Sequence, residues 1–157
     1  MKKVLKIFIV MLVVLVVAIA VRKIYYSVVE IEPNDLYLTK ENTEESFIAT
    51  KGSYSWNDKG GSVIADSISP LEMDYSKEID VKANDKIYFS DDNWTSVGAS
   101  VILAQGRKEI AKVTIESNLE GKYIVVPEIE PGEYVVQINL ESDKGDVWYA
   151  TKINISE

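Results

Sequence analysis

The sequence predicts an all-β sandwich domain preceded by one apolar helix at the N-terminus. Residues 7–21 form an unbroken apolar run. After residue 46, apolar and polar residues alternate in short runs separated by Gly, Asp, Asn and Pro about every 8 to 12 residues, a pattern typical of antiparallel strands. No segment of the sequence after Val21 carries a long apolar stripe at helical spacing.

The apolar run predicts a signal anchor over residues 1–23. With Val4 and Leu5 it reaches about 27 Å as a helix, close to the roughly 30 Å hydrocarbon core of a bilayer. Basic residues flank it on both sides, and Tyr25 and Tyr26 suit an interfacial belt. The positive-inside bias is slight, but the β domain downstream has the character of a secreted domain. We therefore expect a single-pass protein of the cell membrane whose C-terminal domain is extracytoplasmic.

Two other interpretations of the run stay open. Ala18-Ile19-Ala20 matches a signal-peptidase site, which would release a secreted protein after cleavage near Ala20. The run could also be a buried core helix. A lipoprotein anchor is excluded because the chain has no cysteine.

The charge of the chain is unevenly distributed. All 25 acidic residues follow Val21, whereas five of the 17 basic residues lie at or before Lys23. From Ile24 onward, twelve basic residues therefore face 25 acidic ones, a net charge of −13. Such a surface repels phosphate backbones, so nucleic acid is not an expected partner. The charge permits a cationic partner or Ca²⁺ but requires neither.

The absence of histidine and cysteine from the sequence excludes many enzyme classes. Without His, the usual acid–base group near neutral pH and the commonest zinc ligand are missing. Without Cys, there is no thiol nucleophile, disulfide or Cys-based metal site. We expect neither catalysis nor a cofactor.

We divide the chain into the anchor (1–23), an acidic linker (24–45) and a β-sandwich domain (46–157). The linker is rich in acidic residues, Thr and Asn, and it contains the turn signal Pro33-Asn34-Asp35. Within it, Leu36-Tyr37-Leu38 could form a first strand or pack as an arm.

The domain alternates most clearly in its last third. Tyr134, Val136, Ile138 and Leu140 share one face of a strand, and Gln137, Asn139 and Glu141 lie on the other. A turn at residues 142–145 returns the chain into a strand in which Val147, Tyr149 and Ile153 share a face. The expected strands are 47–50, 53–56, 62–66, 79–82, 86–90, 99–104, 110–117, 123–126, 134–140 and 147–155.

The turn into the strand at 134 carries a more specific signature. Ile129-Glu130-Pro131-Gly132-Glu133-Tyr134 combines an apolar residue, a Pro-Gly turn and a tyrosine that opens an alternating strand. This arrangement resembles the tyrosine corner of immunoglobulin-like sandwiches, in which the tyrosine hydroxyl bonds to nearby backbone. The resemblance implies an immunoglobulin-like antiparallel β-sandwich and a structural role for Gly132 and Tyr134.

A second segment also resembles known proteins. Gly52-Ser53-Tyr54-Ser55-Trp56, Val63-Ile64-Ala65-Asp66-Ser67 and Pro70-Leu71 are similar to a segment of uncharacterised, membrane-anchored proteins of Gram-positive bacteria. A like segment occurs in extracytoplasmic regions of sensor-type membrane metallopeptidases. About twenty residues carry the resemblance and none is catalytic, so it implies at most an accessory or sensing module.

Four residues are candidates for a ligand site: Trp56, Asp66, Trp94 and Trp148. An exposed tryptophan can stack on a sugar ring or anchor a protein partner. Trp148 lies on the face of its expected strand opposite to Tyr149, so we expect it to be partly exposed. The competing interpretation is that Tyr54 and Trp56 fill the core and that Asp66 fixes a turn.

A metal site is the weaker candidate. Asp85, Asp91, Asp92 and Asn93 offer oxygen ligands of the kind that Ca²⁺ prefers, at the two ends of one expected strand. They lack the spacing of an EF-hand loop, and solvated loop acids are the default interpretation.

These observations predict a membrane-anchored binding or accessory module of the bacterial envelope, held by its N-terminal helix, with a protein or glycan partner at the cell surface. One alternative is a carbohydrate- or cell-wall-binding module that uses the tryptophans. Another is a sensor or regulator that partners a membrane peptidase or an antibiotic-response system.

Overall fold

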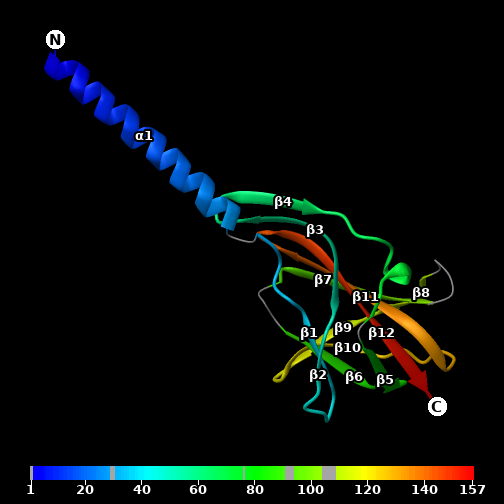
Figure 1. Ribbon diagram of the computed structural model, residues 1–157. Helices are drawn as coiled ribbons and strands as arrows, with labels where there is room; N and C mark the ends of the chain where they lie inside the picture. The colour runs from blue at the N-terminus through cyan, green and yellow to red at the C-terminus, as the bar shows by residue number, and fades with distance from the viewer. Residues whose placement is uncertain (1, 29–30, 76, 91–93, 104–108) are drawn as a thin grey trace.

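The computed structural model shows a β-sandwich with one long helix extending from it (Figure 1). It describes residues 2–28, 31–75, 77–90, 94–103 and 109–157. The helix emerges at one end of the sandwich, and the C-terminus lies at the opposite end (Figure 1).

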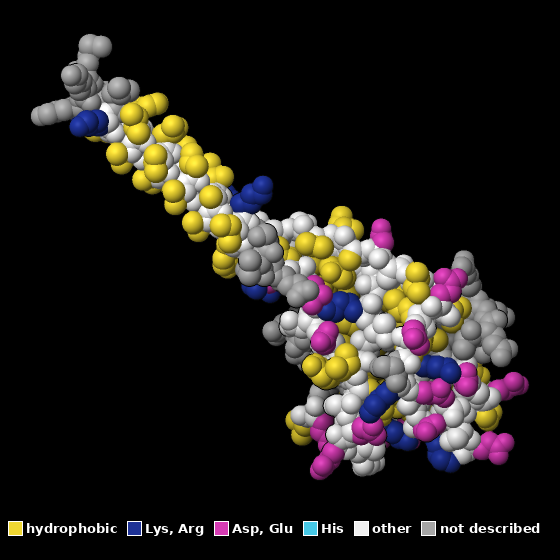
Figure 2. Space-filling model, viewed as in Figure 1, with side chains coloured by type: hydrophobic (Ala, Val, Ile, Leu, Met, Phe, Trp, Pro, Cys, Tyr) yellow, Lys and Arg dark blue, Asp and Glu magenta, His cyan; other side chains and the backbone are white. Residues whose placement is uncertain are grey.

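Helix α1 (Lys2–Val28) contains a segment that is long and apolar enough to cross a membrane. This segment covers 20 residues, Lys6–Tyr25, with a mean hydropathy of 2.8, and none of it is buried against the sandwich. Twenty residues correspond to about 30 Å of helix, the thickness of a bilayer core. Apolar side chains cover the visible face of the helix, and acidic side chains are confined to the sandwich (Figure 2). The helix continues beyond residue 23 and includes the basic pair Arg22-Lys23.

Sheet A has five strands. Their spatial order is β2 (Ser46–Ile48), β1 (Tyr37–Lys40), β6 (Lys86–Phe89), β10 (Gly121–Val125) and β9 (Ile115–Asn118). All neighbours are antiparallel.

Sheet B has seven strands and is built around the hairpin of the last two. Its spatial order is β4 (Gly61–Ala65), β3 (Thr50–Asp58), β12 (Gly145–Ser156), β11 (Gly132–Ser142), β7 (Ser96–Leu103) and β8 (Glu109–Val113). The first half of β12 pairs with β3, and its second half pairs in parallel with β5 (Glu78–Lys82). The short 3₁₀ helix η1 (Pro70–Glu72) lies between β4 and β5 and contacts β11.

This strand order is that of an immunoglobulin-like sandwich. The order β1-β6-β10-β9 corresponds to strands A, B, E and D of that fold, and β7-β11-β12 corresponds to C, F and G. The β3–β4 hairpin is an addition that extends sheet B beyond the last strand. The predicted fold class, an immunoglobulin-like sandwich behind one apolar helix, is thus confirmed.

Each expected strand range overlaps a strand of the structure, but two ranges cross from one sheet to the other. The range 47–50 joins the end of β2, in sheet A, to the first residue of β3, in sheet B. The range 110–117 is not one strand, because β8 ends at Val113 and pairs with β7, whereas β9 begins at Ile115 and pairs with β10. The chain therefore changes sheets at Thr114. No Gly, Pro, Asn or Asp marks this crossing, which is why the sequence pattern does not reveal it.

The packed domain also starts earlier than residue 46. Leu36 and Leu38 are 1% and 0% exposed, and β1 pairs with β6 in sheet A. The segment before β1 is attached to the sandwich as well. Lys51 Nζ lies 3.3 Å from the Glu32 carboxylate and 3.5 Å from that of Asp35, both in the range expected to be a linker.

The core fills the space between the two sheets. Its largest fully buried side chains alternate along the central strands and come from both sheets: Leu36, Leu38, Ile79, Ile87, Ile124, Ile138, Leu140, Tyr149 and Ile153. Burying a side chain of this size contributes about 1.5–3 kcal/mol. The same alternation turns the intervening residues of each strand outward, and these residues line the outer surfaces described below.

The tyrosine corner is present. Tyr134 is buried, and its hydroxyl donates a hydrogen bond of 2.7 Å to the backbone carbonyl of Glu130. Gly132 has a φ of +153°, which L-residues rarely adopt. The bond fixes the turn through which the chain enters β11, as predicted for Gly132 and Tyr134.

We expect Tyr134→Phe to lower the free energy of unfolding by about 1 kcal/mol, because the Glu130 carbonyl loses its donor. Urea denaturation of the full-length protein in mild detergent measures this difference. The matched control is Tyr37→Phe, since Tyr37 is exposed and its hydroxyl has no hydrogen bond within the described residues. An equal effect of the two substitutions would contradict the structural role of the corner.

Candidate functional site

Two of the three tryptophans belong to the core. Trp56 and Trp94 are 6% and 7% exposed, and their ring centroids lie 5.8 Å apart. The Trp94 Nε1–H is buried and has no hydrogen-bond partner among the residues that the structure describes. This burial corrects the expectation that both indoles lie on a ligand-binding surface, because Trp56 and Trp94 face the opposite sheet.

Trp148 is the tryptophan that reaches the surface. It is half-buried and lies at an irregularity of the β3–β12 pairing, where the register shifts between Val147 and Tyr149. A Cβ placed on Gly52 would lie 2.2–2.3 Å from three atoms of its six-membered ring, Cδ2, Cε2 and Cε3. Such nearly equal distances mean that the indole rests flat on Gly52. The opposite face of the ring is therefore turned away from the sheet.

A hollow of about 320 Å³ lies beside this indole on the outer face of sheet B. The register places Gly98, Asn139 and Trp148 side by side on three neighbouring strands. Among the described residues, Gly98 has no neighbour within 4 Å of the position that a Cβ would take, so these residues leave the space above β7 open at this point. We call this surface the Trp148 hollow; it is lined by Gly98, Asn139, Leu140, Glu141, Asp146, Val147 and Trp148.

Two carboxylates face each other at the edge of the hollow. Glu141 and Asp146 are direct cross-strand partners, and both side chains are exposed. Neither forms an ion pair or a side-chain hydrogen bond with another residue in the described part of the chain. Like charges directly opposite each other destabilise a sheet, so a ligand that brings a positive charge would relieve this pair.

Asn139 offers a further polar group. Its side-chain oxygen accepts a 2.8 Å hydrogen bond from Gln137 Nε2, which orients the amide. The Asn139 NH₂ group then has no partner among the residues that the structure describes and is free to donate to a ligand.

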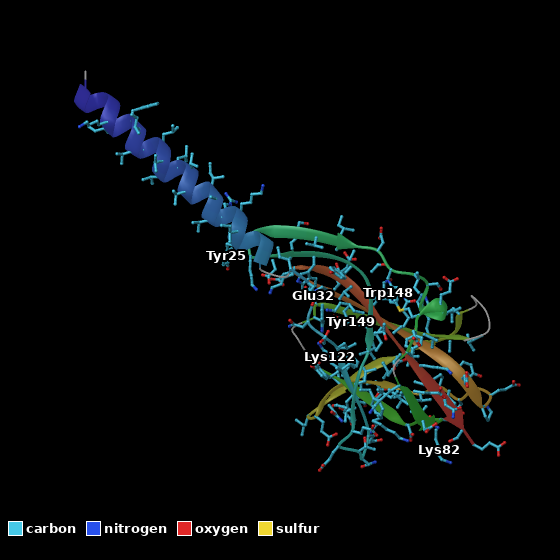
Figure 3. The ribbon with its side chains drawn as sticks, viewed as in Figure 1. Tyr25, Glu32, Lys82, Lys122, Trp148 and Tyr149 are labelled. Atoms are coloured by element: carbon cyan, nitrogen blue, oxygen red, sulfur yellow. The ribbon has the colours of Figure 1, made fainter. Side chains whose placement is uncertain are left out.

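The hollow lies in the half of the sandwich that is nearer to α1. Ile31, three residues after the helix ends, packs on Gly61 at the start of β4, and the Asn57 N–H donates to the Lys144 carbonyl in the adjacent turn (2.7 Å). Three residues span at most about 11 Å, so these two turns lie close to the end of the helix. Figure 3 shows Trp148 and Glu32 in this half and Lys82 at the far end.

Asp66 lies outside this site. It is exposed and follows β4, and the next residue, Ser67, donates its backbone N–H to Ser53 Oγ (3.0 Å). The turn around Asp66 is thus held by Ser53 and Ser67. Asp66 is not among the residues that line the Trp148 hollow.

The Asp85 carboxylate has a structural role. Its oxygen accepts a 2.9 Å hydrogen bond from the Lys82 N–H and lies 3.0 Å from Lys40 Nζ. Partial burial raises the pKa of Asp85, but the bond from Lys82 and the Lys40 ammonium outweigh it and hold that pKa below its ordinary value. The other three expected metal ligands, Asp91, Asp92 and Asn93, lie outside the described residues. Within the described residues, no three His, Cys, Asp or Glu side chains are arranged to hold a metal.

Of the residues at the hollow, only Trp148 was a sequence-based candidate. The alternation along β11 places Asn139 and Glu141 on the outer face, so the sequence held a signal for them. The contribution of Gly52 could not be foreseen, because it comes from a strand almost a hundred residues away. Comparison of the chain with protein-family models and with curated proteins finds no match, so the site rests on its own geometry.

The hollow makes a direct prediction about quenching of tryptophan fluorescence. Cs⁺ should quench Trp148 more strongly than I⁻, because Glu141 and Asp146 concentrate cations beside the indole. Trp148→Phe should remove most of the quenchable emission, since Trp56 and Trp94 are buried.

The double variant Glu141→Gln, Asp146→Asn should lower Cs⁺ quenching and raise I⁻ quenching. Glu44→Gln with Glu130→Gln is the matched control, because it removes the same charge from exposed positions that do not line the hollow. An equal response of the two double variants would mean that the carboxylates do not act on the indole.

Proposed function

We propose that this protein is a single-pass, membrane-anchored, extracytoplasmic binding module that receives its ligand in the Trp148 hollow. One observation carries this proposal: the flat indole of Trp148 lies beside two carboxylates that form no ion pair with a lysine or arginine of the described chain. The apolar helix supports the anchor. The resemblance of residues 52–71 to segments of Gram-positive membrane proteins supports a place in a bacterial envelope.

The chemistry of the hollow favours a ligand with a positive charge on a compact apolar body. The face of a tryptophan ring attracts a cation, and it does so best among the aromatic side chains. The negative charges of Glu141 and Asp146 also attract a cation, and no described lysine or arginine forms an ion pair with either carboxylate. An alkylammonium group satisfies both features, because its methyl or methylene groups pack on the indole while its charge faces the carboxylates.

The attachment of the segment after α1 supports binding close to the membrane. Ile31 packs on Gly61, Lys51 contacts the carboxylates of Glu32 and Asp35, and the Tyr149 hydroxyl donates to the Asn34 carbonyl. These contacts hold the segment from Ile31 to Asp35 on the sandwich, so this segment does not act as a free tether. The hollow would then stay near the outer headgroups.

The proposed orientation is testable with single cysteines, because the natural chain has none. Leu119→Cys lies at a fully exposed hairpin end, and Lys3→Cys lies at the start of α1. A membrane-impermeant maleimide should label the first on intact cells and the second only after permeabilisation, with both variants in the membrane fraction.

Other labelling patterns distinguish the alternatives. Leu119→Cys found in the medium, on a chain that has lost residue 3, would show cleavage near Ala20. Labelling of Lys3→Cys alone on intact cells would invert the topology, and recovery of both variants in the cytosol would refute the anchor.

The ligand class is tested with choline and 3,3-dimethylbutan-1-ol, a pair of the same shape in which carbon replaces the charged nitrogen. For the full-length protein in neutral detergent, we expect choline to bind at least tenfold more tightly, a difference of about 1.4 kcal/mol. Calorimetry measures both affinities, and choline binding should weaken as salt rises.

Three variants make the test specific. Trp148→Ala should abolish choline binding, and Glu141→Gln with Asp146→Asn should reduce it to the level of the neutral alcohol. Glu44→Gln with Glu130→Gln should leave it unchanged. Equal affinity for the two probes, or no binding of either, would refute a cationic ligand.

A further inference from the structure

A second concave surface lies on the opposite side of the molecule, on the outer face of sheet A. It has a volume of about 570 Å³ and is lined by β1 and the turn after it, by β6, and by Glu120 in the β9–β10 turn. It follows β1 from Tyr37 to Lys40, a length of about 10 Å. We call it the tyrosine groove. It shares no lining residue with the Trp148 hollow.

Two tyrosines form the aromatic part of this groove. Tyr37 is 47% exposed and lies opposite Ser90 on the neighbouring strand, one step along from the pair of Thr39 and Tyr88. Tyr37 and Tyr88 are therefore diagonal neighbours on one face of the sheet, a separation that aromatic side chains can bridge.

The Tyr88 ring is held in place by its surroundings. It packs on Tyr123 with a centroid separation of 5.2 Å, and its hydroxyl oxygen accepts a 3.0 Å hydrogen bond from Asn118 Nδ2. Tyr123 is fixed in turn by Glu116, whose carboxylate accepts a 2.7 Å hydrogen bond from the Tyr123 hydroxyl. A ring fixed in this way loses little conformational entropy when a ligand stacks on it.

The charges of the groove are neutralised within the protein, in contrast to those of the Trp148 hollow. Lys40 Nζ lies 3.0 Å from the Asp85 carboxylate, and the Glu41 carboxylate lies 3.0 Å from Lys86 Nζ. Among the described residues that line the groove, Glu120 is the one charged side chain outside an ion pair. A ligand gains little here by carrying a net charge.

Neutral hydrogen-bonding groups remain available along the groove. The Tyr37 hydroxyl has no partner within the described chain, and the Tyr88 hydroxyl keeps its own proton free to donate. Ser90 Oγ accepts a long 3.4 Å bond from the Tyr37 N–H and no other bond within the described residues, and the Asn42 amide is exposed. These groups, with Glu120 as an acceptor, suit a ligand that carries many hydroxyls on rings with an apolar face.

We propose that the tyrosine groove binds a neutral carbohydrate chain, with a sugar ring stacked on Tyr37 and its hydroxyls bonded to Tyr88, Ser90 and Glu120. A peptide added as a strand fits the groove less well, because β1 is already paired on both sides, with β2 and with β6. The proposed site is additional to the Trp148 hollow and does not depend on it.

The test uses the full-length protein in detergent that contains no sugar headgroup. Tetrasaccharides of glucose (β-1,4 and α-1,4), xylose and N-acetylglucosamine serve as neutral probes, and calorimetry measures the affinities. We expect at least one probe to bind, with an affinity that does not change between about 0.1 and 1 M NaCl, where the Debye length falls from about 10 to 3 Å.

Variants locate the binding. Tyr37→Ala should weaken it at least tenfold, whereas Tyr37→Phe should retain most of it, because the phenyl ring still stacks. Tyr37 is exposed, so neither change should prevent folding, and an unchanged midpoint of urea denaturation for both variants checks this. Trp148→Ala is the reciprocal control and should bind the sugar normally.

Each other outcome overturns the inference. If none of the neutral probes binds in calorimetry, the groove is not a carbohydrate site. The same conclusion follows if only charged glycans or peptides bind. Sugar binding that is lost in Trp148→Ala but kept in Tyr37→Ala assigns the sugar to the hollow, and it would also contradict the cationic ligand proposed there. If sugar binding does not depend on Tyr37 but choline still binds in the Trp148 hollow, only the carbohydrate proposal is refuted, and the proposed function stands.

Discussion

The structure depends above all on strand β12 and on the strict alternation of its side chains. Val147, Tyr149, Thr151, Ile153 and Ile155 are all buried and point between the two sheets. On its edges, β12 pairs with β11 over its whole length and with β3 and then β5 on the other side. The free energy gained by burying one face of β12 therefore sets the register of its neighbours, since a shift by one residue would expose this face.

The same strand couples the core to the segment that follows helix α1. Tyr149 is fully buried, and its hydroxyl reaches the Asn34 carbonyl in the segment that leads out of α1. Lys51, the β3 residue paired with Tyr149, holds Glu32 and Asp35. A buried hydroxyl needs a partner, and the Asn34 carbonyl accepts a hydrogen bond from this one, which ties the segment to the sandwich. From Ile31 onward, the range expected to be an acidic linker is in this way part of the domain.

Local patterns predicted the fold better than the site. The span of α1, the overlap with each strand and the bond of Tyr134 follow from features within a few residues of each other, such as apolar length, period two and a Pro-Gly turn. The burial of Trp56 and the docking of β1 depend on which face meets the second sheet, and a short alternating run does not specify that. The Trp148 hollow and the tyrosine groove need strands far apart in sequence to pair in one register, and one of them needs a shift in that register as well.

Two glycines, Gly52 in strand β3 and Gly145 in strand β12, allow the Gly52–Trp56 segment to lie close to β12. A Cβ on Gly145 would lie 1.9 Å from the Ser55 carbonyl oxygen, and one on Gly52 would lie 2.2 Å from the nearest atom of the Trp148 ring. Both glycines thus permit the close approach of β3 to β12, one for the backbone and one for the indole. Because β3 leads directly into the turn beside Ile31, this approach also brings the β3–β4 hairpin to the end of the helix. The segment thereby seats Trp148 and positions the hollow near the end of α1, while one of its own aromatic residues, Trp56, fills the core.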